Sequence, residues 1–126
     1  DRSPSRGLGD VYKRQAKKLS QARTYAQKAI SFNENYGEPY ILLAQMYGSN
    51  PNWSDEPALN RCTYYVVIDK LQRAKAVDPS VTDKVNELIA TYARHTPQAK
   101  DLFMLGYKAG DRITIGGWIG ESTTIR

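Results

Sequence analysis

The sequence has little of the chemistry that most enzyme sites need: one cysteine, Cys62, and one histidine, His95. A single cysteine excludes an internal disulfide and leaves the redox compartment undefined. One cysteine and one histidine are also fewer than the four ligands of a structural zinc site, so we expect no metal. Cys62 lies on the apolar stripe of a predicted helix and His95 in the last turn of another, which favours a buried inert thiol and a helix-end cap. We therefore expect no catalytic residues, no cofactor and no enzymatic activity.

Long apolar runs are missing as well. No stretch of about eighteen apolar residues occurs, so we expect no membrane-spanning helix. The chain begins at Asp1 and shows no signal peptide, but this leaves the cellular compartment unknown because an upstream segment can be missing. The glycines of GDRITIGGWIG (110–120) lack a following Gly-Lys-Ser/Thr, so they form no phosphate-binding loop, and turn formation accounts for them.

The charge is basic, with a formal net charge of +5 and a pI near 9.4. Residues 1–15 contribute +2, from four basic and two acidic side chains, which leaves +3 for the rest. Beyond residue 15 the two signs are interleaved along predicted helices, as on a solvated face. We therefore expect no nucleic-acid partner.

The first fifteen residues, DRSPSRGLGDVYKRQ, differ in character from the remainder. They have no apolar periodicity before Val11, and they resemble the translated adapter read-through that contaminates some metagenomic assemblies. The alternative is a natural flexible tail. We treat residues 1–15 as a non-native or disordered leader, although the segment DVYKRQ favours helix and can extend the element that follows.

Apolar spacing predicts helices through most of the chain. Residues 16–32 carry apolar side chains three and four apart, as on one face of a helix. A second helix is predicted from a cap at Asn35 to Gly48. A long third helix is predicted from a cap at Asp55 to the Asp78–Pro79 pair, because the residue before proline avoids helical geometry.

Two shorter helices follow. Ser80 and Asp83 have the spacing of a capping box and predict the start of a fourth helix. A fifth begins at Pro97 and can end in a left-handed turn at Gly106 or Gly110. After it the sequence changes to β-branched residues and glycines.

Two segments share the pattern of a helical repeat: YILLAQMY (40–47) and AKAVDPS (74–80). They resemble the two helices of the tetratricopeptide repeat (TPR), a helix–turn–helix unit of about 34 residues. The resemblance covers roughly residues 16–105, with an insertion near 48–61, and departs from the family pattern at Glu34, which occupies a proline position. In this register the residues that pack paired helices are Tyr40, Leu43, Ala44, Tyr47, Leu71, Ala74 and Pro79.

The resemblance implies a mainly α fold. Residues 16–106 would form antiparallel helix pairs of a TPR-like α-solenoid, about five helices in all, followed by a β-hairpin tail or cap in residues 107–126. A generic helical bundle has similar core stripes and is the alternative interpretation. The segment GDRITIGGWIGESTTIR (110–126) also resembles the C-terminal end of certain bacterial TPR proteins.

For function, the resemblance implies a non-catalytic protein–protein interaction scaffold, part of a parent chain with upstream repeats. The candidate groove that binds a protein or peptide partner is formed by Glu38, Ile41, Gln45, Asp83, Asn86 and Ala90. A solvated face without a ligand is the alternative for these residues. The family's carboxylate clamp of Lys, Asn and Arg is absent, since the nearest residues are Ile41, Leu42, Asn86 and Glu87. A second hypothesis makes the chain a structural capping end-piece of a longer solenoid, without a ligand of its own.

The tail, residues 112–126, is predicted to form two short strands around a turn. An isolated hairpin is marginal in water, so we expect it to pack on the helices. Trp118 and Ile119 are its largest apolar pair near the turn, and we expect them to cover the last helix pair at Leu102, Phe103 and Leu105. The competing interpretation makes Trp118 an exposed docking residue for a partner.

Overall fold

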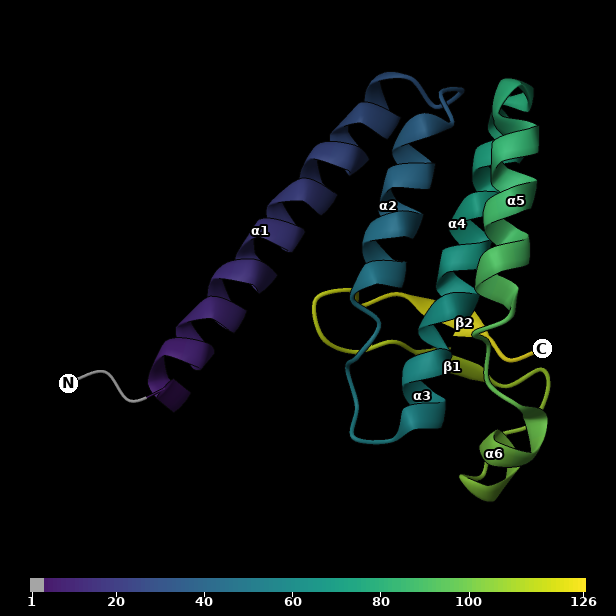
Figure 1. Ribbon diagram of the computed structural model, residues 1–126. Coiled ribbons are helices and arrows are strands. Elements are labelled where there is room, and N and C mark those ends of the chain that lie inside the picture. The colour runs from purple at the N-terminus through teal and green to yellow at the C-terminus, as the bar shows by residue number, and fades with distance from the viewer. Residues whose placement is uncertain (1–3) are drawn as a thin grey trace.

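The computed structural model describes the backbone of residues 4–126 and the side chains from residue 17 onward. Within this part the chain is mainly helical and ends in an antiparallel pair of short strands (Figure 1). In chain order the elements are α1 (Pro4–Phe32), α2 (Glu38–Ser49), α3 (Pro57–Arg61), α4 (Thr63–Val77), the 3-10 turn η1 (Pro79–Val81), α5 (Thr82–Ala93), α6 (Ala99–Met104), β1 (Arg112–Thr114) and β2 (Ser122–Thr124).

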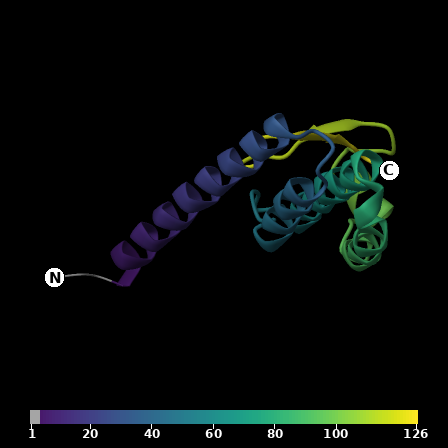
Figure 2. The ribbon, with the colours of Figure 1, turned by 90° about the horizontal axis from the view of Figure 1, so that it is seen from above.

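Helices α2, α4 and α5 lie side by side and alternate in direction, whereas α1 lies beside α2 at its C-terminal end and diverges from it toward the N-terminus (Figure 1, Figure 2). Helix α4 packs against both α2 and α5, while α1 packs against α2. This arrangement confirms the predicted antiparallel helix pairs. The long third helix is instead divided into α3 and α4, because the N–H of Cys62 bonds the carbonyl oxygen of Leu59, three residues back, at 3.1 Å. Such a tightened turn interrupts the regular α-helical pattern.

The core lies mainly between α2 and α4. Ala44 of α2 and Ala74 of α4 are fully buried, and small side chains at such positions let helix axes approach closely. Six of the residues predicted to pack paired helices are buried here: Tyr40, Leu43, Ala44, Tyr47, Leu71 and Ala74. The seventh, Pro79, is exposed and begins η1.

Gly48 lies inside α2, which continues to Ser49, so the prediction that this glycine ends the helix is wrong. A Cβ at residue 48 would lie 2.6 Å from Cε1 of Tyr92 on α5, closer than packed atoms approach. The absence of a side chain at Gly48 therefore permits contact with α5.

Three predicted caps are replaced by neighbouring residues: Asn35 by Gly37, Asp55 by Glu56, and Ser80 by Val81. One side chain accounts for two of these corrections. Asp78 accepts the N–H of Gly37 at 2.9 Å on one carboxylate oxygen and the N–H of Ser80 at 3.1 Å on the other. Asp78 therefore fixes both the residue before α2 and the η1 turn that precedes α5.

The short helix α6 begins at Ala99, two residues after the predicted start at Pro97. It ends before Gly106, whose φ of 93° confirms the predicted left-handed turn. Tyr107, the next residue, donates its N–H to the carbonyl oxygen of Leu102 at 2.9 Å, which closes the turn.

The backbone of α1 begins at Pro4, so the helix predicted for residues 16–32 extends through most of the leader. The segment DVYKRQ is part of this helix, as its composition allows. The side chains of the leader lie outside the described residues. Its interpretation as a non-native segment stays a prediction.

The predicted strands are present in the tail. β1 and β2 pair antiparallel, with Ile113 opposite Thr123, and the tail lies along one face of the α2–α4 pair (Figure 2). Ile113, Ile115, Ile119 and Ile125 are buried in the common core. The tail is therefore part of the folded unit.

The prediction that Trp118 covers the last helix pair was wrong. Half-buried Trp118 packs edge-on against Tyr47 of α2, with ring centroids 5.2 Å apart, and leaves Phe103 and Leu105 exposed. Its carbonyl oxygen accepts a hydrogen bond from Arg23 of α1 at 2.8 Å. Polar partners on the first helices thus hold the tail there, away from the exposed residues of α6.

Candidate functional site

A groove runs between α1 and α2, with a volume of about 380 Å³. Its lining is mostly apolar and comes from both helices and the loop between them: Tyr25, Ala26, Ala29, Tyr36, Glu38, Pro39, Ile41, Leu42 and Gln45. Its position follows from the loop after α1, which reverses the chain and brings the two helices together as an antiparallel pair (Figure 1).

The walls of this groove carry large apolar side chains that no other part of the described chain covers. Tyr25 on α1 is 74% exposed and Leu42 on α2 is 48% exposed, whereas Ile41, which also lines the groove, is only 1% exposed. The groove therefore has a buried apolar floor and exposed apolar walls. This combination is typical of surfaces that bind a peptide or a helix.

The structure brings together three of the six predicted groove residues. Glu38, Ile41 and Gln45 line the α1–α2 groove. The other three, Asp83, Asn86 and Ala90, are exposed on α5 and do not line it. The amide oxygen of Asn86 accepts a hydrogen bond from Lys75 at 3.0 Å, and Glu38 pairs with Lys84 at 3.3 Å.

Sequence reasoning missed the other wall of the groove. Tyr25 and Ala29 share the three- and four-residue spacing of the apolar residues in 16–32, and this spacing predicts packing against a neighbouring helix. The available signal in the sequence was Tyr36, an aromatic residue in the otherwise polar loop after that helix. In the structure Tyr36 is exposed and lines the groove.

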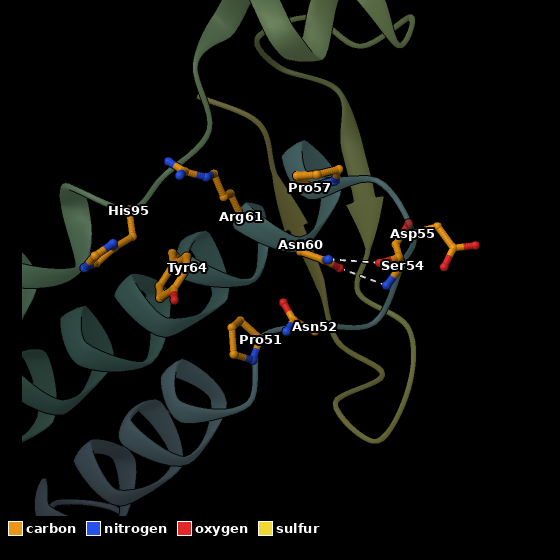
Figure 3. Close-up of a pocket in the computed structure, with 9 residues that line it drawn as sticks. All are labelled: Pro51, Asn52, Ser54, Asp55, Pro57, Asn60, Arg61, Tyr64 and His95. Atoms are coloured by element: carbon orange, nitrogen blue, oxygen red, sulfur yellow. Dashed lines mark hydrogen bonds between the residues drawn. The ribbon is translucent and has the colours of Figure 1, made fainter. Parts of the chain in front are cut away.

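A second, polar pocket of about 600 Å³ lies beside the insertion between α2 and α4 (Figure 3). Asn60 fixes its loop, since its side-chain oxygen accepts the N–H of Trp53 at 2.9 Å and of Ser54 at 2.8 Å. Tyr64 and His95 line the opposite side, with ring centroids 5.3 Å apart. The insertion is thus a folded element held by its own hydrogen bonds.

The histidine and the cysteine lie in different surroundings. Cys62 is fully buried, and burial raises the pKa of its thiol to about 11. A thiol with this pKa is protonated at neutral pH and a poor nucleophile. His95 is exposed just after the end of α5, where its backbone N–H donates a hydrogen bond to the carbonyl oxygen of Tyr92 at 2.9 Å. No cluster of three metal-ligating side chains occurs among the described residues.

No described helix is long and apolar enough to span a membrane. Comparison with protein-family models, with curated proteins and with solved structures finds no match to this chain. The functional argument therefore depends on the residues and surfaces of the chain itself.

Proposed function

We propose that this chain is a non-catalytic protein–protein interaction scaffold built of TPR-like helix pairs, whose α1–α2 groove binds an extended peptide or a partner helix. The observation that carries the proposal is that two exposed apolar side chains, Tyr25 of α1 and Leu42 of α2, line one groove together with buried Ile41. The sequence resemblance to TPR supports the same assignment. The proposal includes no cofactor and no nucleic-acid partner.

The groove has both parts that peptide recognition requires. Covering the exposed surface of Tyr25 and Leu42 would contribute about 1–2 kcal/mol each to binding. Glu38 and Gln45, one near each end of the α2 wall, offer polar groups that can bond a peptide backbone or a side chain. Apolar anchors give affinity, while such polar groups fix the register and direction of the bound segment.

The proposal is tested by selecting peptides from a displayed random library against the intact chain. We expect enriched peptides with regularly spaced apolar residues, whose affinity falls at least about tenfold in Leu42→Glu. Ala90→Glu is the matched control, because Ala90 is exposed on α5 and does not line the α1–α2 groove. Selection of no binder, or of binders equally tolerant of Leu42→Glu, would reject the α1–α2 groove as the site.

A second candidate function is the structural end-piece of a longer solenoid, with upstream repeats packed on α1. The exposed Phe32 and Tyr25 favour it, since both lie on α1, where a preceding helix would pack. The tail's hydrogen bond to Arg23 also gives α1 a fixed place on the unit.

This candidate predicts that upstream repeats cover Phe32. A Phe32→Cys variant should react readily with a thiol reagent in residues 1–126 and be protected in a longer parent chain. Buried Cys62 gives a low background in both. Equal reactivity in the two chains would count against the end-piece.

A further inference from the structure

A second apolar groove lies between α6 and the final residues of the tail, with a volume of about 470 Å³. Leu102 forms its buried floor, whereas Phe103 and Met104 beside it are 74% and 84% exposed. The tail was expected to cover this helix, but it packs on α2 and α4 instead. Phe103 and Met104 therefore stay in contact with water.

The charged side chains that line this groove have one sign. Lys100, Lys108 and Arg126 line it, and among the described residues that do so there is no acidic side chain. Arg126 is partly neutralised because its guanidinium pairs with Asp69, and the same group lies 5.0 Å from the ring centroid of Tyr65. Lys100 and Lys108 therefore supply most of the positive charge.

Two carboxylates lie near this groove outside its lining. Asp101 is exposed on α6 next to Lys100. Asp111 is occupied by the backbone, since it accepts the N–H of Lys108 at 3.0 Å. Neither side chain lines the apolar surface, so an acidic ligand in the groove meets the lysines first.

We propose that the α6 groove is a second docking site, specific for an amphipathic peptide that combines apolar anchors with acidic residues. The apolar anchors cover Phe103 and Met104, and the acidic residues pair with Lys100 and Lys108. The site is concave, with one wall from α6 and the other from the tail, which suits the curved surface of a helix better than a flat lipid surface. It is independent of the α1–α2 groove, which lies at the other side of the row of helices (Figure 1, Figure 2).

The test uses a pair of synthetic peptides of about four helical turns, each with leucine along one face. One carries glutamate on its remaining positions, and its twin carries lysine there. We expect the glutamate peptide to bind and the lysine twin to bind at least about tenfold more weakly, with a difference that shrinks as salt is raised. Lys100→Glu/Lys108→Glu should weaken the glutamate peptide by about tenfold.

A matched charge control separates local pairing from the overall charge. Lys17→Glu/Lys28→Glu changes the net charge equally on exposed positions of α1 and should leave binding unchanged. Phe103→Ser should abolish most binding without loss of the folded state, because Phe103 is exposed. Its thermal unfolding is measured alongside. Leu42→Glu should bind the glutamate peptide as the unchanged protein does, which keeps this test separate from that of the α1–α2 groove.

A label within the groove reports where the peptide binds. A polarity-sensitive dye on Met104→Cys should shift its emission to shorter wavelength with the glutamate peptide, while the same dye on Ser49→Cys should not respond. Buried Cys62 stays unlabelled. Absence of binding, equal binding of both peptides, or unchanged binding in Phe103→Ser would overturn the proposal. Vesicles of anionic phospholipid are measured in parallel, and binding of vesicles without binding of the peptide would also reject it.

Discussion

Replacing Tyr47 with phenylalanine removes one hydroxyl from the point where the β tail meets the helices. This hydroxyl donates a hydrogen bond to the Glu121 carboxylate at 2.5 Å, and the other oxygen of the same carboxylate pairs with Lys70 at 2.7 Å. Tyr47 is on α2, Lys70 on α4 and Glu121 in the tail. Burial, together with the neighbouring Glu121 carboxylate, raises the pKa of Tyr47, so the hydroxyl remains a donor at neutral pH.

The magnitude follows from the charge and exposure of the acceptor. A hydrogen bond to a charged group contributes about 1.5–3 kcal/mol when the group is left without a replacement. Glu121 keeps its pairing with Lys70 and is only partly buried, so water can replace some of the lost interaction. We therefore expect Tyr47→Phe to lower the free energy of unfolding by about 1–2 kcal/mol.

The assay is urea denaturation followed by circular dichroism, with Tyr40→Phe as the matched control. Tyr40 is also buried on α2, and its hydroxyl makes no hydrogen bond to another described residue, so its loss should cost less than about 0.5 kcal/mol. A double-mutant cycle with Glu121→Gln should give a coupling energy of about 1 kcal/mol. If Tyr47→Phe and Tyr40→Phe cost the same, the hydrogen bond does not hold the tail and the reasoning is refuted.

Three further predictions concern the core, a loop and the tail. Ala44→Leu or Ala74→Leu should lower the free energy of unfolding by about 1–3 kcal/mol in denaturant melts, because the added atoms overpack the core. The control Ala76→Leu, at an exposed position, should have no effect. No effect at either buried site would reject the close approach of the helices. The hydrogen bonds that Asp78 accepts from Ser80 in the η1 turn, and then from the amide of Gly37, lower the pKa of its carboxyl. The contribution of Asp78 to stability is therefore present at neutral pH and is lost as pH falls through that lowered pKa. Asp78→Asn should therefore be less stable at neutral pH and show a shallower decline in acid, as measured by melts from pH 7 to about pH 2. Trp118→Ala should lower the free energy of unfolding by about 2–4 kcal/mol, because Trp118 is half-buried against α2. In a Trp53→Phe background, iodide should quench the fluorescence of Trp118 only partly, for the same reason.

Local sequence patterns predicted the elements well because helices and short strands are set largely by near neighbours. The three- and four-residue spacing of apolar side chains gave the paired helices, and the β-branched segment after residue 111 gave the strands. The helix starts were less predictable. Asn35 and Ser80 have suitable side chains for a helix cap. The carboxylate of Asp78, however, accepts hydrogen bonds from the amides of both Gly37 and Ser80. The bond to Gly37 joins residues that are 41 positions apart in the sequence. No pattern within either loop reveals such a contact.

The position of the tail shows why the candidate sites were only partly predictable. Its alternating isoleucines require burial, but several helical faces could have satisfied that requirement. Polar pairs select among them: Glu121 with Tyr47 and Lys70, and Thr123 with Asp69 at 2.7 Å. These partners are on α2 and α4, so the tail covers that pair and leaves Phe103 and Met104 of α6 exposed. The half of the α1–α2 groove formed by α2 was implied by the resemblance to the TPR, whereas the α6 groove depends on where the tail packs, since Ile125 and Arg126 line it. Weakening those polar pairs should therefore act on both stability and the α6 surface, since the tail that binds α4 also supplies one wall of that groove.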